Sequence, residues 1–85
     1  MDVILEQYTG LKDKNDVDIY VGDIVRLKDK NGKIGNVIVG FEDGAFIVFK
    51  GMAYRNISFY NTDELEVIGN INENKEILKW AKQEQ

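Results

Sequence analysis

Two short turn signals constrain the fold of this chain more than any other feature. Asn31-Gly32 and Asp43-Gly44 are residue pairs that accept the positive φ angles of a two-residue β-hairpin loop, and each lies between strand-like segments. Residues 33–42, which join them, alternate apolar with polar or small side chains. The apolar positions on one face of this segment are Val37, Val39 and Phe41. The pattern predicts an antiparallel meander.

Further strands are expected on either side of this meander. Glycine marks their boundaries, since the chain contains eight glycines and no proline. We expect strands at residues 3–7, 24–28, 33–42, 45–50, 57–60 and 65–71, a hairpin at 11–20 and a loose connection at 51–56. We find no repeat, low-complexity tract or linker, so residues 1–85 are interpreted as a single domain.

A small barrel is the arrangement that suits these strands best. Five short antiparallel strands leave aggregation-prone edges unless the sheet closes. We therefore predict a mainly β fold: a small SH3-like β-barrel of about five antiparallel strands, with an N-terminal hairpin extension. The hydrophobic period changes after Asn74, a good helix N-cap, and predicts a short C-terminal helix. Three side chains share one face of that helix: Ile77, Trp80 and Ala81.

Missing residue types exclude many catalytic functions. The chain has no histidine and no cysteine, which removes the usual zinc ligands, the commonest general base and all thiolate chemistry. Its single serine, Ser58, has no evident base to activate it. Residues 13–18 begin like a calcium-binding loop, but Ile24 stands where that loop needs a bidentate glutamate. We expect no enzyme activity, no metal and no cofactor.

A basic patch interrupts an otherwise acidic chain. The formal net charge is −4 and the isoelectric point is about 4.7. One predicted hairpin nevertheless carries four bases: Arg26, Lys28, Lys30 and Lys33. They form either a contact for nucleic acid or an acidic partner, or the solvated face of a hairpin whose lysines protect a sheet edge. Four bases make only a modest phosphate contact, which favours the second interpretation.

Aromatic side chains offer another kind of site. Phe41, Phe49 and Phe59 are expected in the core. Tyr54 lies beside Arg55 in the predicted connection and is the best candidate for an exposed aromatic that stacks on a ligand or contacts a peptide. The alternative, which is favoured, is a tyrosine packed within that segment.

Two blocks of sequence carry a family resemblance. Residues 8–25, YTGLKDKNDVDIYVGDIV, and residues 66–71, EVIGNI, resemble the signature blocks of the YopX family of small phage and prophage proteins. The resemblance implies a phage or prophage protein and brings no activity with it. Many members carry an additional N-terminal segment, which we expect to be dispensable here or replaced by another chain. The family usually has Asn-Gly where this chain has Asn15-Asp16, so a looser or slightly strained turn is expected.

The residue types within the blocks suggest shared backbone geometry. Pairs that commonly form turns, bulges and caps recur in them: Thr9-Gly10, Gly22-Asp23 and Gly69-Asn70. A site built from Asp13, Tyr20 and Asp23 is an alternative, and the sequence does not show that these side chains converge. The blocks therefore predict architecture before they predict chemistry.

Two classes of function remain. The first is a non-catalytic module that binds a host or phage protein, or itself; the second is a nucleic-acid-binding accessory protein that uses residues 26–33 and Tyr54. The acidic isoelectric point favours the first. Self-association would bury apolar residues near both ends of the chain: Val3, Ile4, Leu5, Ile77, Trp80 and Ala81. Without a basic leader or a membrane-length apolar stretch, we expect a cytoplasmic protein of the host cell with no membrane partner.

Overall fold

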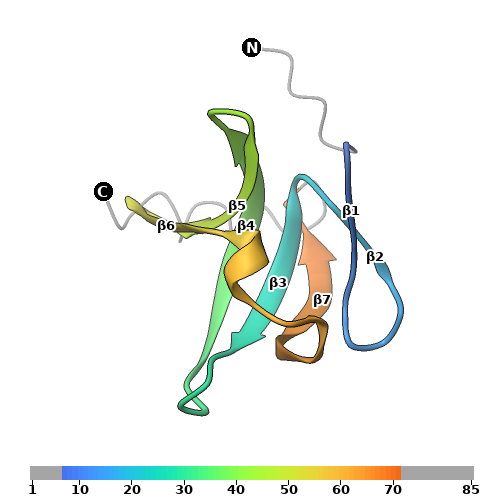
Figure 1. Cartoon of the computed structure of the whole chain (residues 1–85), viewed down its shortest axis with the longest axis vertical. Coiled ribbons are helices and arrows are strands. Elements are labelled where there is room, and N and C mark those ends of the chain that lie inside the picture. The colour runs from blue at the N-terminus through green and yellow to red at the C-terminus, as the bar shows by residue number, and fades with distance from the viewer. Residues whose placement is uncertain (1–6, 72–85) are drawn as a thin grey trace.

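The computed structural model describes residues 7–71, which fold mainly into antiparallel β-structure (Figure 1). The strands, in chain order, are β1 (Tyr8–Lys12), β2 (Asp18–Tyr20), β3 (Asp23–Lys28), β4 (Ile34–Glu42), β5 (Ala45–Lys50), β6 (Ala53–Asn56) and β7 (Leu65–Asn70). Two single-turn 3₁₀ helices, η1 (Ile57–Phe59) and η2 (Thr62–Glu64), lie between β6 and β7. The prediction of a mainly β fold is confirmed.

The strands form two sheets rather than a closed barrel. β1 and β2 pair as a hairpin, and the other five strands form a sheet in the order β6-β5-β4-β3-β7. The predicted N-terminal hairpin and five-stranded sheet are confirmed, but the predicted closure is wrong, because β6 and β7 are edges that do not pair. The hairpin turn occupies the outer edge of β7 instead, where the Lys14 N–H donates to the Leu65 carbonyl oxygen at 2.9 Å.

The main core lies on the inner face of the five-stranded sheet. Val25, Val39 and Val48 line this face from the three central strands, and Ile19 of the hairpin packs fully buried against them. Ile57 of η1 joins the same cluster. Burying an aliphatic side chain of this size contributes about 1.5–3 kcal/mol, so this face supplies most of the stabilisation.

A smaller cluster lies on the outer face of the sheet. Ile24 and Ile38 are 0% and 2% exposed there, with Phe49 and Ile71 packed beside them. Neighbouring residues of β3 therefore bury side chains on both faces, Ile24 on the outer and Val25 on the inner. The sheet is covered on its inner face and only partly covered on its outer face.

The chain after β5 differs from the sequence prediction. Residues 51–56 were expected to be a loose connection, but Ala53–Asn56 form the edge strand β6. Residues 57–60 were expected to be a strand, yet Ile57–Phe59 form η1. The Asn56 side chain accepts the Ser58 N–H at 2.9 Å and thereby caps this helical turn, which redirects the chain from β6 toward β7.

Two of the three phenylalanines expected in the core are exposed. Phe41 is 47% and Phe59 is 53% exposed, whereas Phe49 is half-buried in the outer cluster. Phe41 lies near the end of β4 and packs edge-on against Phe46 at a centroid distance of 5.0 Å. Residues at the end of a strand lie beyond the covered part of the sheet, so alternation alone did not identify them as exposed.

The two predicted hairpin turns have different lengths. Asp43 and Gly44 both have positive φ angles, 53° and 79°, as a two-residue loop requires. At the other turn only Gly32 has a positive φ, and its N–H donates to the Asp29 carbonyl oxygen at 2.9 Å. That turn is a three-residue loop closed by glycine, so its predicted two-residue length is wrong.

Several sequence predictions lie outside the described residues. They are the C-terminal helix, the strand at residues 3–7 apart from Gln7, and the association surface of Val3, Ile4, Leu5, Ile77, Trp80 and Ala81. Gln7 directly precedes β1, and its carbonyl oxygen accepts the Val21 N–H at 2.9 Å. Among residues 7–71, no helix has the length and apolar character needed to cross a bilayer.

Candidate functional site

A five-residue repeat, missed in the sequence prediction, forms the same turn twice. LKDKN occurs at residues 11–15 and again at 27–31. In the first copy the Asp13 carboxylate accepts the N–H groups of Asn15 and Val17 at 2.8 and 2.9 Å. In the second copy Asp29 accepts N–H groups two and four residues later at 2.9 and 2.8 Å. The repeated aspartate is therefore a turn former in both places.

Asp13 also makes a long-range contact that Asp29 lacks. Its second carboxylate oxygen accepts the Val67 N–H of β7 at 2.8 Å, across 54 positions of sequence. Asp13 is only 2% exposed. A buried carboxylate with three N–H donors joins the hairpin to β7 and, with the Lys14–Leu65 bond, occupies the outer edge of that strand.

Asp23 forms a second link between the two sequence blocks. Its carboxylate accepts the Tyr20 N–H at 2.8 Å and an Asn70 side-chain N–H at 3.3 Å. Beside it, the Gly22 carbonyl oxygen accepts the Ile71 N–H at 2.9 Å. Tyr20 and Asp23 are therefore neighbours, as the sequence left open, but Asp13 makes a separate link and the three do not form one site.

The two buried carboxyl groups have opposite pKa shifts. Burial alone would raise the pKa of Asp13, but the N–H donors of Val67, Val17 and Asn15 outweigh it and hold the pKa below its ordinary value. Burial dominates at Asp23 and raises its pKa, although two hydrogen bonds oppose the shift. Asp13 thus binds three backbone N–H groups, and Asp23 binds the Tyr20 N–H and the Asn70 side chain, so both carboxyl groups hold the two sequence blocks together.

The opposite edge of the sheet, formed by β6, has no further partner strand among residues 7–71. All four residues of β6 are exposed, and the described strands pair with β6 only through β5. Figure 1 shows the hairpin on the β7 side of the sheet and β6 on the other side. Because alternate residues of an antiparallel strand direct their N–H and C=O groups away from the partner strand, the outer edge of β6 carries backbone groups that pair with no strand among residues 7–71.

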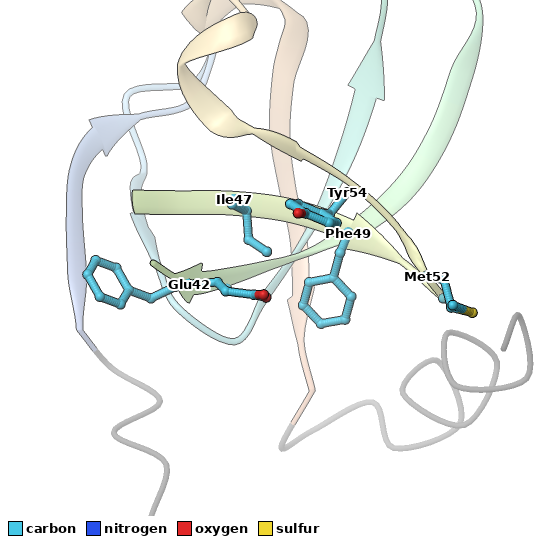
Figure 2. A pocket seen from close by; sticks show the side chains of 8 residues that line it. Glu42, Ile47, Phe49, Met52 and Tyr54 are labelled. Atoms are coloured by element: carbon cyan, nitrogen blue, oxygen red, sulfur yellow. The ribbon is translucent and has the colours of Figure 1, made fainter. Parts of the chain in front are cut away.

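An apolar hollow of about 420 Å³ lies beside this edge on the outer face of the sheet. Figure 2 shows Phe49 within it, Ile47 and Tyr54 next to Phe49, and Met52 at the turn into β6. The absence of a side chain at Gly40 makes room, since a Cβ there would lie 3.1 Å from the Phe49 ring. Tyr54 is 62% and Met52 is 76% exposed, so the favoured interpretation of Tyr54 as a packed side chain is wrong.

A cationic cluster lies at the same edge, around Phe59. The Arg55 guanidinium carbon is 4.3 Å and the Lys30 ammonium is 5.7 Å from the centroid of the Phe59 ring. Both distances fall within the range of cation–π attraction. Lys30 belongs to the turn between β3 and β4, Arg55 to β6 and Phe59 to η1, so three elements meet in this cluster.

The predicted set of binding residues is therefore divided by the structure. Lys30 and Arg55 come together, whereas Tyr54 lies on the opposite face of β6 from Arg55. Arg26 points outward from β3 and pairs with Glu66 of β7 at 3.6 Å, which offsets its charge. Lys28 and Lys33 are exposed and have no ion pair among the described residues.

The sequence analysis did not identify the Phe59 cluster, because Lys30 is far from Arg55 and Phe59 along the chain. Phe59 was assigned to the core, and Lys30 was grouped with the other bases of the hairpin. The segment from Met52 to Phe59 also lacks a simple alternation, since β6 is exposed on both faces. A basic residue before an aromatic at a capped turn, Arg55 followed by Asn56 and Phe59, is the local signal that could have indicated it.

Comparison with known protein families agrees with the two sequence blocks. The model of the YopX protein family matches residues 1–79 of the 85-residue chain. The chain belongs to the YopX family. A comparison with the curated proteins finds no match.

The contacts explain what the YopX signature blocks do in this chain. Thr9-Gly10 form an irregularity in the β1–β2 pairing, where the Thr9 hydroxyl donates to the Ile19 carbonyl oxygen at 2.7 Å. Asp13 and Asp23 tie the first block to the second. Among residues 7–71, no three acidic side chains gather where they could hold a metal ion. The blocks build the scaffold, and the candidate functional site is the separate edge formed by β6, its hollow and the Phe59 cluster.

Proposed function

We propose that this YopX protein is a non-catalytic protein-binding module that takes an extended segment of a host or phage protein onto β6. The observation that carries the proposal is the contrast between the two edges of the sheet. β7 is covered by backbone and carboxylate contacts from the hairpin turn, whereas β6 is exposed along its whole length. Strand addition at a sheet edge, with a pocket for side chains beside it, is a recurring mode of peptide recognition.

The strand order supports an SH3-like relationship as part of this proposal. An antiparallel meander with 3₁₀ turns before its last strand is consistent with that architecture, even though the sheet does not close. The lack of histidine and cysteine supports the absence of catalysis. A screen for hydrolase and nuclease turnover tests this part, and an activity abolished by one acidic-to-amide substitution would refute it.

The test of the binding function is selection followed by mapping. Random ten-residue peptides are displayed and selected on the purified chain, and the enriched peptides are titrated into ¹⁵N-labelled protein. We expect the amide signals of Ala53–Asn56 to shift while those of Leu65–Asn70 stay in place. Peptides that bind without shifting any β6 amide would contradict the proposal.

Nucleic-acid binding is the second candidate function. Lys30 and Arg55 around an exposed Phe59 favour it, because bases stack on aromatic rings beside cations. The net charge of −4 and the pairing of Arg26 with Glu66 weigh against it. Fluorescence anisotropy with a labelled oligothymidylate decides the matter: salt-sensitive binding that is lost in Arg55→Gln would support this function over the first.

Self-association is part of the same proposal and concerns residues outside the described range. The predicted surface includes Trp80 on the chain's apolar C-terminal stripe. Light scattering at micromolar concentration tests it, with Trp80→Ala as the variant. A mass that stays at the 9.7 kDa monomer value in both proteins would refute self-association.

A further inference from the structure

The two faces of β6 differ in chemistry, and the difference constrains what can pair with its edge. Tyr54 lies opposite Phe49 in the β5–β6 pairing and faces the apolar hollow. Arg55 is the next residue, lies opposite the core residue Val48, and points to the other face, over Phe59. Because consecutive side chains of a strand alternate between faces, a strand added to β6 directs its own side chains alternately to these two environments.

The Arg55 face carries two cations, Arg55 and Lys30, that form no ion pair among the described residues. Asp29 and Glu64 line the same depression as Arg55, Lys30 and Phe59. Their carboxylates are engaged by backbone N–H groups of their own turns, and neither forms an ion pair with Arg55 or Lys30. Two neighbouring cations without an ion pair attract a carboxylate, because Arg and Lys form charge-assisted hydrogen bonds with it.

The hollow on the other face has the opposite preference. Phe49, Met52, Tyr54 and Ile47 give it an apolar lining, which favours an aliphatic or aromatic side chain. Among the described residues that line it, Glu42 alone is charged, and its carboxylate repels acidic groups. Acidic side chains are therefore favoured on the Arg55 face only.

We infer that the segment bound at β6 is an extended peptide in which apolar and acidic residues alternate. The inference rests on the proposed function, since it assumes that a strand pairs with β6. A second copy of this chain fits less well. Two β6 strands related by a two-fold axis place their Arg55 side chains on the same face at adjacent or facing positions, where like charges repel.

Three labelled ten-residue peptides probe the charge preference directly. They alternate valine with glutamate, with glutamine or with lysine, and a fourth peptide has the valine–glutamate composition arranged in two blocks. Binding is measured by fluorescence anisotropy, and the site by amide shifts in ¹⁵N-labelled protein. We expect the alternating valine–glutamate peptide to bind at β6 about tenfold more tightly than the lysine peptide, with the block peptide also weaker. The difference should shrink at high salt.

Two charge-matched variants separate the site from general electrostatics. Arg55→Glu and Lys28→Glu change the net charge equally, but Lys28 lies on β3 and does not line the depression around Phe59. We expect Arg55→Glu to reverse the preference toward the lysine peptide and Lys28→Glu to leave it in place. Arg55→Gln, which keeps hydrogen-bond donors, should abolish the preference in either direction. Thermal melting of each variant establishes that it is folded.

The outcomes distinguish the inference from the function on which it rests. If the three alternating peptides shift the β6 amides with equal affinity, β6 is a binding edge and the acidic preference is refuted. If none of them, nor any selected peptide, shifts those amides, the proposed function itself fails. If an oligothymidylate binds through Arg55 and Lys30 while the valine–glutamate peptide does not, the cationic cluster serves nucleic acid and the inference is overturned.

Discussion

Replacing Asp13 with alanine should cost far more stability than replacing its counterpart in the repeated turn. Asp13 and Asp29 each accept two local N–H groups, but only Asp13 accepts the Val67 N–H of β7. A hydrogen bond to a charged group contributes about 1.5–3 kcal/mol, and the bonds at the exposed turns are partly replaced by water. We therefore expect the free energy of unfolding to fall by roughly 3–5 kcal/mol in Asp13→Ala and by about 1–2 kcal/mol in Asp29→Ala.

The difference between these two variants isolates the long-range contact. A domain of this size has a free energy of unfolding of roughly 4–13 kcal/mol, and each kcal/mol shifts the melting temperature by about 4–8 °C. Urea and thermal denaturation followed by circular dichroism would measure both variants. Equal losses for Asp13→Ala and Asp29→Ala would refute the reasoning, because the shared local bonds would then account for the whole effect.

Acid provides an independent test of the same contact. The pKa of Asp13 is lowered in the folded protein, so its stabilisation is complete above the unfolded-state pKa of about 3.9 and is lost as pH falls through the lowered value. The stability difference between the wild type and Asp13→Ala should therefore be constant from pH 5 to 7 and shrink in stronger acid. A constant difference down to pH 2 would contradict the assignment.

Three further predictions follow from single residues. Burial raises the pKa of Asp23, so its contribution to the free energy of unfolding is complete below about pH 3.9 and is lost as pH rises through the raised pKa. By calorimetry, Asp23→Asn should melt at or above the wild-type temperature at pH 7, and this gain should vanish near pH 3. Asp16 and Gly32 each follow one copy of the LKDKN repeat, with φ angles of 66° and 81°, which strain aspartate but not glycine. In urea denaturation, Asp16→Gly should therefore raise the free energy of unfolding by about 0.5 kcal/mol, and Gly32→Asp should lower it by about as much. Tyr54→Ser should change stability by less than about 0.5 kcal/mol while weakening peptide binding, since its side chain is 62% exposed; a large loss of stability would show that Tyr54 is structural.

The sequence predicted the elements whose residues show a clear pattern. The strand at 45–50 was predicted with its observed bounds, and both main hairpin turns were found at the right places. β6 was missed because it is exposed on both faces and so has no apolar alternation. η1 was assigned as a strand because Ile57 and Phe59 alternate with polar Ser58, whereas the Asn56 cap decides the local conformation.

The candidate site was less predictable than the fold, for a physical reason. Contacts such as Arg55 and Lys30 with Phe59 depend on strand order, and the order β6-β5-β4-β3-β7 cannot be read from local periodicity. The repeat LKDKN could have been found by inspection. It would have identified Asp13 and Asp29 as equivalent turn residues, but the burial of Asp13 and its bond to the Val67 N–H would still have required the structure.

The division between scaffold and site explains why the blocks that define the family resemblance contain little of the candidate binding surface. An open sheet needs at least one edge covered to avoid indiscriminate pairing, and Asp13 and Lys14 do this at β7. Under the proposed function, the other edge would be short, exposed and selective, because β6 has only four residues and its two faces differ in chemistry. A bound strand with the wrong charge pattern would then meet Arg55 on one face or Glu42 on the other. The proposal thus assigns protection from pairing to the β7 edge and selective pairing to the β6 edge.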